Sequence, residues 1–168
     1  EIPEVNDTQI DLPINAFIPA TWILNREEKL DAYKSATECS NNNELTELAT
    51  DWVNRYGTLP KPVESLIMLM KLKLVAKRCG FNKIKLKKPN ILIETKLKQS
   101  TFKILRNSLP NSVQNKFNFD EGEQFSIITI RGLGVTEIQN QIDQLMFWFG
   151  LFLKEINNFD KDVLMKKK

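Results

Sequence analysis

The sequence contains no histidine and only two cysteines in 168 residues. Without an imidazole the chain cannot build a Ser-His-Asp triad, a Cys-His pair or a histidine-ligated metal site. Cys39 and Cys79 have no metal-ligand or CxxC spacing, and both fall in segments with helical patterns. We therefore expect them to be free thiols, buried or half-buried, in a reducing cytoplasm.

Phosphate loops and membrane spans are missing as well. The pair Gly132 and Gly134 lacks the further glycine and the Lys-Ser/Thr of a P-loop, and the longest apolar run covers only residues 145–153. A membrane helix needs about 20 apolar residues. Acidic groups such as Glu27 with Glu28, or Asp120 with Glu121, are interpreted as solvated charges at a helix start and in a loop. The sequence predicts neither a catalytic site nor contact with a membrane.

The chain is long enough for one domain with its own core. The acidic, proline-containing start is interpreted as a linker over residues 1–9, followed by a domain over 10–157 and a frayed tail over 158–168. Loose alternation of apolar residues over 10–18 predicts an extended segment, which Pro13 would confine to the edge of a sheet.

Three helices are predicted next. Asn25 with Glu28, and Asn41 with Glu44, have the spacing of N-terminal capping boxes. The first helix has a short apolar stripe, namely Leu30, Tyr33 and Ala36. The second has a regular stripe that ends before Gly57, namely Leu45, Leu48, Ala49, Trp52, Val53 and Tyr56. A third helix begins at Pro62 and ends at Gly80, with apolar residues on two faces.

The second half of the chain indicates a small, mostly antiparallel sheet. Ile84 and Leu86 alternate with lysines before a turn at Pro89, which predicts a hairpin with residues 91–93. A short helix over 98–107, a third strand over 125–130 and a long last helix over 136–156 follow. The predicted fold class is therefore α+β, with an extended segment and three helices before a sheet on which the last helix packs.

Charge is distributed unevenly. Residues 1–70 carry five basic and twelve acidic side chains, whereas residues 71–106 carry twelve basic and one acidic. The basic region could be the solvated face of a half-buried hairpin, or it could contact a polyanion such as nucleic acid. The residues for such a contact are Lys71, Lys77, Lys83, Lys85 and Lys87.

Three strings resemble one family. Residues 10–19 read IDLPINAFIP, residues 29–34 read KLDAYK, and residues 51–57 read DWVNRYG, with a Leu-Pro pair at 59–60. In that order they are similar to I-D-L-P-x-D-A-Y-I-P, R-L-x-x-Y-R-R and E-L-x-D-R-F-G-x-L-P. These patterns are found in the C-terminal domain of bacterial transcription-repair coupling factors. The resemblance extends over roughly residues 10–81.

The resemblance implies a parent protein that is an ATP-driven DNA translocase, which displaces stalled RNA polymerase and recruits UvrA for nucleotide excision repair. It implies that this domain has no ATPase motif and no cofactor, since ATP and Mg belong to the motor of the parent. The domain is expected to fold back on the UvrB-like N-terminal module, mask the UvrA-binding surface and restrain the motor.

The same resemblance directs attention to the polar face of the second helix. The acidic face of that helix would meet basic residues of the UvrB-like module, so the expected docking residues are Glu47, Asp51, Asn54, Arg55, Tyr56 and Gly57. The chain departs from the family here, because Asp51 replaces a glutamate and Asn54 replaces the second acid. A purely solvated helix face is the alternative.

Overall fold

Residues 14–74 form a helical unit whose first two helices begin at asparagine caps. In the computed structural model, which describes residues 1–166, the helices are α1 (Arg26–Glu38), α2 (Asn42–Tyr56) and α3 (Lys61–Arg78), and the last turn of α3 belongs to the second unit. The Asn25 side-chain oxygen accepts from the Glu28 N–H at 3.1 Å, and the Asn41 oxygen accepts from the Glu44 N–H at 2.9 Å. Both asparagine caps are confirmed, but the boxes are not closed as predicted, because the Glu44 carboxylate accepts from the Ser40 N–H and the Glu28 carboxylate accepts from the Tyr56 hydroxyl.

The core of this unit is aliphatic and aromatic. Its buried members are Ile18, Ile23, Ala32, Ala36, Trp52, Val63, Leu66 and Ile67. The predicted stripe of α1 is wrong at Leu30, which is 58% exposed, and right at Ala36, which is buried together with Ala32. Val53 of the α2 stripe is also 42% exposed.

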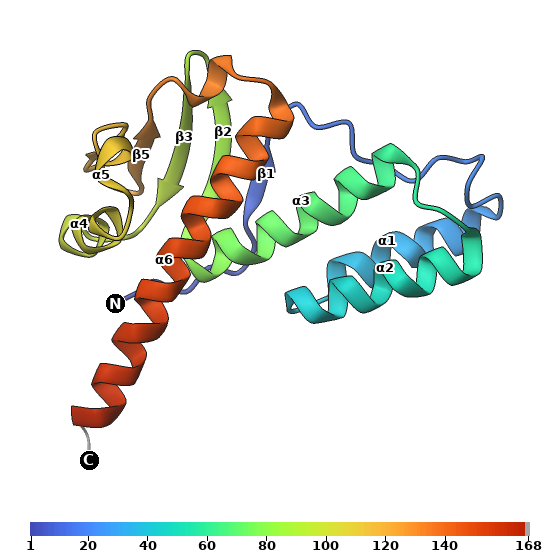
Figure 1. Ribbon diagram of the computed structural model, residues 1–168, viewed down its shortest axis with the longest axis horizontal. Coiled ribbons are helices and arrows are strands. Elements are labelled where there is room, and N and C mark those ends of the chain that lie inside the picture. The colour runs from blue at the N-terminus through green and yellow to red at the C-terminus, as the bar shows by residue number, and fades with distance from the viewer. Residues whose placement is uncertain (167–168) are drawn as a thin grey trace. The chain divides into compact units, whose positions relative to one another are not determined.

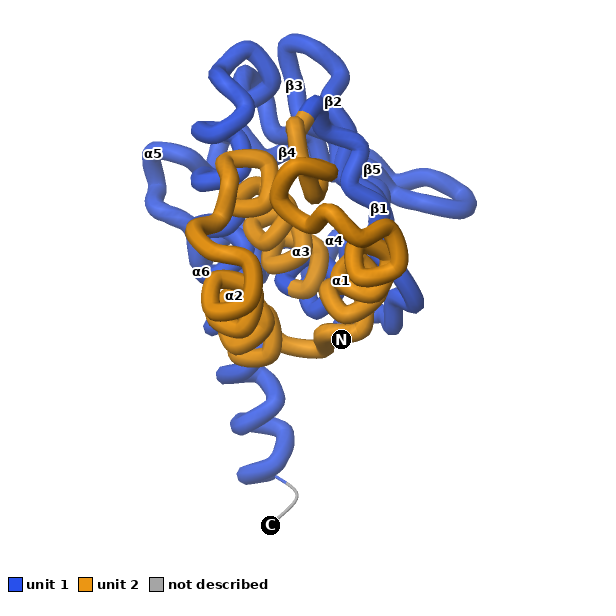
Figure 2. Tube along the Cα trace, turned by 90° about the vertical axis from the view of Figure 1, so that its right-hand side faces the viewer, with its two compact units in different colours: residues 1–13, 75–168 blue, residues 14–74 orange. Residues whose placement is uncertain are grey.

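A second unit comprises Glu1–Pro13 and Val75–Lys168, shown in blue in Figure 2. Its sheet has the order β1-β2-β3-β5-β4, in which β1 is parallel to β2 and the other pairs are antiparallel. The strands are β1 (Gln9–Asp11), β2 (Phe81–Lys87), β3 (Asn90–Thr95), β4 (Phe117–Asp120) and β5 (Ser126–Ile130). The extended segment predicted over 10–18 is an edge strand as expected, but it ends at Asp11.

One face of the sheet is covered by α6 (Ile138–Lys166), which crosses it in Figure 1. The Phe81 and Phe149 ring centroids lie 4.9 Å apart, and those of Phe117 and Trp148 lie 5.2 Å apart. The sheet supplies further buried residues to this core, namely Ile84, Ile91, Ile93, Ile128 and Ile130. The predicted α+β class, with a long C-terminal helix on a mostly antiparallel sheet, is confirmed.

Several elements differ from the prediction. The helix α4 (Gln99–Asn107) lies where it was expected, but α5 (Asn111–Gln114) and β4 were not predicted. The helix α6 continues to Lys166 instead of ending at Ile156, so the frayed tail predicted from residue 158 is helical as far as the structure describes it, and residues 167–168 lie outside the described part. At the other end, Val5 and Thr8 of the predicted linker are buried. The domain boundaries themselves stay a prediction.

The Gly132–Gly134 segment is a packing element. A 3-10 turn, η1 (Leu133–Val135), follows Gly132, whose φ of 78° lies in the left-handed region. The Gly134 N–H donates to the Pro89 carbonyl oxygen at 2.9 Å, and a Cβ at this position would lie 2.7 Å from the Asn90 oxygen. The glycine is therefore required for close contact with the β2–β3 turn.

Candidate docking surface

The predicted docking residues lie on or beside one exposed face of α2. We call Glu47, Asp51, Asn54 and Arg55 the α2 ridge; all four are exposed. They are spaced at three and four residues, so a regular helix places them along one side. The structure therefore brings the predicted residues together on one surface.

Charge on the ridge is only partly neutralised within it. An Arg55 guanidinium nitrogen lies 3.8 Å from an Asp51 carboxylate oxygen, and each side chain is 56% exposed. Such an exposed i,i+4 pair stabilises a helix by roughly 0.3–0.5 kcal/mol. Glu47 has no ion pair among the described residues. The ridge thus presents one carboxylate without an ion pair, Glu47, and one in a loose exposed pair, Asp51.

Aromatic side chains pack on the buried side of α2, opposite the ridge. Trp52 is 2% exposed, and its ring lies edge-on to Trp22 with centroids 6.1 Å apart. Trp22 in turn contacts Tyr56 edge-on at 5.4 Å. Each such ring pair contributes about 0.5–1.5 kcal/mol beyond its burial. The last turns of α2 are therefore packed on aromatic side chains, which hold the helix backbone while the ridge side chains stay exposed.

Tyr56 links the ridge to α1. Its hydroxyl donates to a Glu28 carboxylate oxygen at 3.3 Å, and the Arg55 guanidinium lies over its ring at 5.2 Å from the centroid. Partial burial raises the pKa of Tyr56, the neighbouring Glu28 adds to the rise, and the Arg55 charge opposes it. Tyr56 therefore stays protonated at neutral pH and remains a hydrogen-bond donor.

Gly57 ends α2 by backbone geometry. Its φ is 90°, a value favoured by glycine, and its N–H donates to the Val53 carbonyl oxygen at 2.9 Å. No atom lies within 4 Å of a Cβ built at this position. Glycine is therefore needed here for its conformation and not for space.

The residues of the predicted basic region do not form one surface within one unit. Lys71 belongs to the helical unit, whereas Lys77, Lys83, Lys85 and Lys87 belong to the sheet unit. On β2, the Lys85 ammonium lies 3.6 Å from a Glu94 carboxylate oxygen, and Asp11 of β1 is its register partner on the other side. Acidic neighbours thus reduce the positive charge of this strand.

Sequence reasoning missed Trp22 and Glu28 as parts of the docking surface. Glu28 was interpreted as a helix-capping residue and a solvated charge, and its contact with Tyr56 spans 28 positions in the sequence. The available signal was a tryptophan in a loop after Pro19, which is typical of an anchored turn. In the described residues, no group of acidic or cysteine side chains could hold a metal ion, and no helix is long and apolar enough to cross a membrane.

Comparison with known proteins identifies the family. The model of the TRCF domain matches residues 12–104, which include the α2 ridge. The chain belongs to the TRCF domain family. The resemblance predicted from the three strings is thereby confirmed, and the match extends past residue 81 through the hairpin and into α4.

Curated relatives of this TRCF domain are transcription-repair-coupling factors. The Bacillus subtilis protein is 33% identical over 72 residues, 43% of this chain, and the Borreliella burgdorferi protein is 30% identical over 93 residues, 54% of this chain. The Mycobacterium bovis protein is 26% identical over 111 residues, 66% of this chain. The chain spans only 6% of the first of these proteins and 8% of each of the other two.

A solved structure has the same fold. A crystal structure of the C-terminal domain of a transcription-repair coupling factor superposes with a TM-score of 0.72 at 21% identity, and the match covers 89% of this chain and 93% of that one. At this identity the likeness concerns the fold alone. The TRCF domain therefore has the architecture of that C-terminal domain.

Proposed function

We propose that this TRCF domain is a non-catalytic, autoinhibitory docking domain. In the proposal the α2 ridge binds the UvrB-like N-terminal module of the same polypeptide. The bound domain covers the surface that UvrA would use and restrains the ATP-driven motor until stalled RNA polymerase is engaged on DNA. The domain itself holds no cofactor, and ATP and Mg act in the motor of the parent protein. A cytoplasmic location stays a prediction.

The observation that carries the proposal is that the ridge side chains are exposed while the opposite side of α2 is packed on aromatic residues. Asp51 and Glu47 point away from a helix whose opposite side is packed on the Trp52 cluster. A docking surface binds more tightly when its side chains are already in place, because less conformational entropy is lost on association. Packing of Trp52 holds the helix backbone that carries the ridge, and the ridge carries the charge that a basic partner surface would complement.

The energetic importance of Asp51 depends on its desolvation. In solvent, its pair with Arg55 contributes about 0–1 kcal/mol at most. When a partner covers it, removing one member of a hydrogen-bonded charge pair costs about 2–5 kcal/mol. Because Asn54 replaces the second acid of the family pattern, Asp51 carries more of the ionic contact here than its counterpart would in a relative. Asp51 is therefore the residue to test first.

The test is a charge reversal in the intact parent protein. Asp51→Lys should increase UvrA binding and basal ATPase activity together, because the restrained state loses its contact. Asp31→Lys, an exposed acid of α1 without an ion pair in the described residues, is the matched control and should change neither quantity. If Asp51→Lys leaves both UvrA binding and ATPase activity at the wild-type values, the proposed surface is wrong.

Nucleic-acid binding through the basic region is the alternative function. The observation in its favour is the regular placement of Lys83, Lys85 and Lys87 along β2. The Glu94 and Asp11 carboxylates beside this strand weigh against it. Binding of this kind should weaken steeply as salt is added, with a slope set by the number of phosphates contacted. No binding to DNA or RNA at low salt would remove this alternative.

A further inference from the structure

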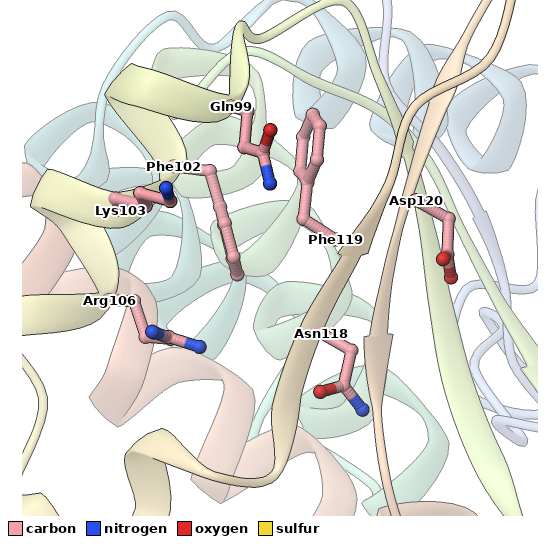
Figure 3. Close-up of a pocket in the computed structure, with 7 residues that line it drawn as sticks. All are labelled: Gln99, Phe102, Lys103, Arg106, Asn118, Phe119 and Asp120. Atoms are coloured by element: carbon pink, nitrogen blue, oxygen red, sulfur yellow. The ribbon is translucent and has the colours of Figure 1, made fainter.

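A groove runs between α4 and β4 in the sheet unit, with a volume of about 480 Å3. Figure 3 shows the side chains that line it, with α4 on one side and β4 on the other. They are Gln99, Phe102, Lys103 and Arg106 from α4, and Asn118, Phe119 and Asp120 from β4. None of these residues belongs to the α2 ridge, so the groove is a separate feature of the molecule.

The strand β4 is the last strand of the sheet, so one of its two edges has no partner strand. The register of β4 with β5 shows which backbone N–H and carbonyl groups of β4 face the edge without a partner strand. The Arg131 N–H donates to the Lys116 carbonyl oxygen at 2.8 Å, and these two residues extend the register in which Phe117 lies opposite Ile130. Because hydrogen-bonded pairs alternate along an antiparallel ladder, Phe117 and Phe119 direct their backbone groups away from β5.

One of these outward groups already has a partner on the groove side. A terminal guanidinium nitrogen of Arg106 lies 3.5 Å from the Phe117 carbonyl oxygen. Among the described residues, the Phe119 N–H and carbonyl oxygen have no partner on this side. Unpaired backbone groups on an outer strand are a template for another extended chain.

The floor of the groove is aromatic and one end is cationic. Phe102 and Phe119 are stacked with ring centroids 5.1 Å apart, and Arg106 lies beside Phe102 at 5.9 Å from its centroid. The Arg106 Nε atom is buried without a hydrogen-bond acceptor among the described residues. Because protein atoms cover this Nε, a ligand in the groove could reach Arg106 only through its terminal guanidinium nitrogens. Lys103 is exposed at the same margin.

We propose that this groove binds an extended peptide segment, which adds to the sheet as a strand along β4 and places a carboxylate near Arg106 and Lys103. The free Phe119 backbone groups would pair with the peptide main chain, and the half-buried Phe119 ring would contact an apolar side chain of the peptide. The combination of an open strand edge, a neighbouring helix and a pocket for alternate side chains is how sheet domains recognise extended peptides. The proposal does not depend on the α2 ridge.

A single-stranded nucleic acid fits this groove less well than a peptide. Bases would need an exposed aromatic face for stacking, but Phe102 is only 3% exposed and its ring is stacked on Phe119. Asp120 also lines the groove, and its negative charge would repel phosphates. The outward N–H and carbonyl oxygen of Phe119 match the main chain of a peptide, which offers both a donor and an acceptor.

The probe is a library of random decapeptides displayed on phage, selected on the whole 168-residue chain. Selection should enrich peptides that contain an aspartate or glutamate among alternating apolar residues. In wild-type protein, a selected peptide should shift the Phe119 backbone amide resonance. Arg106→Ala should weaken its binding at least about tenfold, whereas Lys98→Ala, which removes an exposed cation next to α4 but outside the groove, should leave it unchanged.

Other outcomes would overturn the proposal. They are the absence of enriched peptides, equal binding to Arg106→Ala and wild type, or a peptide that leaves the Phe119 amide unshifted. Should Arg106→Ala disturb the fold, as its amide spectrum would reveal, Arg106→Lys keeps the charge but removes the planar pair of terminal guanidinium donors and should still weaken binding. Displacement of the peptide by a single-stranded oligonucleotide that shifts the same amide would assign the groove to nucleic acid instead.

Discussion

The two units of this domain are built on different cores and offer different chemistry at their surfaces. The helical unit is held by Trp52 and its aromatic and aliphatic neighbours, and presents charged side chains along α2. The sheet unit is held by phenylalanines such as Phe81, Phe117 and Phe149, and presents an unpaired strand edge at β4. The first surface would recognise charge through side chains, and the second would recognise an extended main chain.

The two proposed surfaces would use different chemistry. A helix satisfies its own backbone, so its exposed face can contribute only side chains. An outer strand leaves backbone groups unpaired, so it can contribute backbone hydrogen bonds as well as side-chain contacts. A change at the ridge should therefore leave the groove intact, and a change at the groove should leave the ridge intact.

The largest effect is expected from truncation of the helical core. Trp52→Ala should lower the free energy of unfolding by about 3–5 kcal/mol, because it removes a side chain that is 2% exposed and leaves a cavity. Urea denaturation measures the loss. Val53→Ala, the exposed neighbour, should change stability by less than about 1 kcal/mol.

Hydrogen exchange measures the stability of the two units separately. Trp52 belongs to a cluster formed within the helical unit. The amides of α2 should therefore lose protection in Trp52→Ala, whereas those of β3 and β5 should keep theirs. Equal loss in both units would mean that the two cores unfold as one, and the distinction between them would fail.

Two glycines should respond to the same substitution with opposite signs. Gly57→Ala should destabilise the helical unit by about 1–3 kcal/mol, because a φ of 90° is strained for alanine although nothing blocks its Cβ. Gly150→Ala should stabilise the sheet unit by about 0.5–1 kcal/mol, because Gly150 is exposed inside α6 with open space around it. Thermal unfolding of the two variants measures both. The same sign for both would contradict the role assigned to Gly57.

The smallest effect is expected from the ionisation of Tyr56. Partial burial and Glu28 raise its pKa above the ordinary value of 10.0, so folding favours the protonated form. Its contribution to stability is complete below pH 10 and is lost as the pH rises through the folded-state pKa. Tyr56→Phe should therefore show a slightly smaller loss of stability above pH 10 than wild type. Burial also raises the pKa of Cys79, so only the difference between the two proteins is informative.

Secondary structure was predicted most accurately where a local sequence pattern was sufficient to determine it. Asparagine caps and a regular apolar stripe defined α2, and alternation around Pro89 defined the β2–β3 hairpin. The strand β4 was missed because Phe117–Asp120 is short and includes Asn118 and Asp120, residue types that are uncommon in strands. Its pairing with β5 is a tertiary effect. Consequently the groove beside it could not be predicted either.

The candidate docking surface was predicted in part for the same reason. Helical spacing placed Glu47 and Asp51 on one face, and this required no knowledge of the fold. The contact between Tyr56 and Glu28 and the packing of Trp22 on Trp52 join segments that are distant in the sequence, so no local pattern could indicate them. Leu30 was assigned to the core because it is apolar, but the buried residues of α1 are its alanines.

The most direct test of the docking claim is a binding measurement between this chain and the separately purified UvrB-like module of its own parent protein. Wild type should bind, and Asp51→Lys should bind at least about tenfold more weakly. Its free energy of unfolding should stay within about 1 kcal/mol of wild type, because the Asp51–Arg55 pair is exposed. Absence of wild-type binding, or equal affinity for the two proteins, would contradict the account.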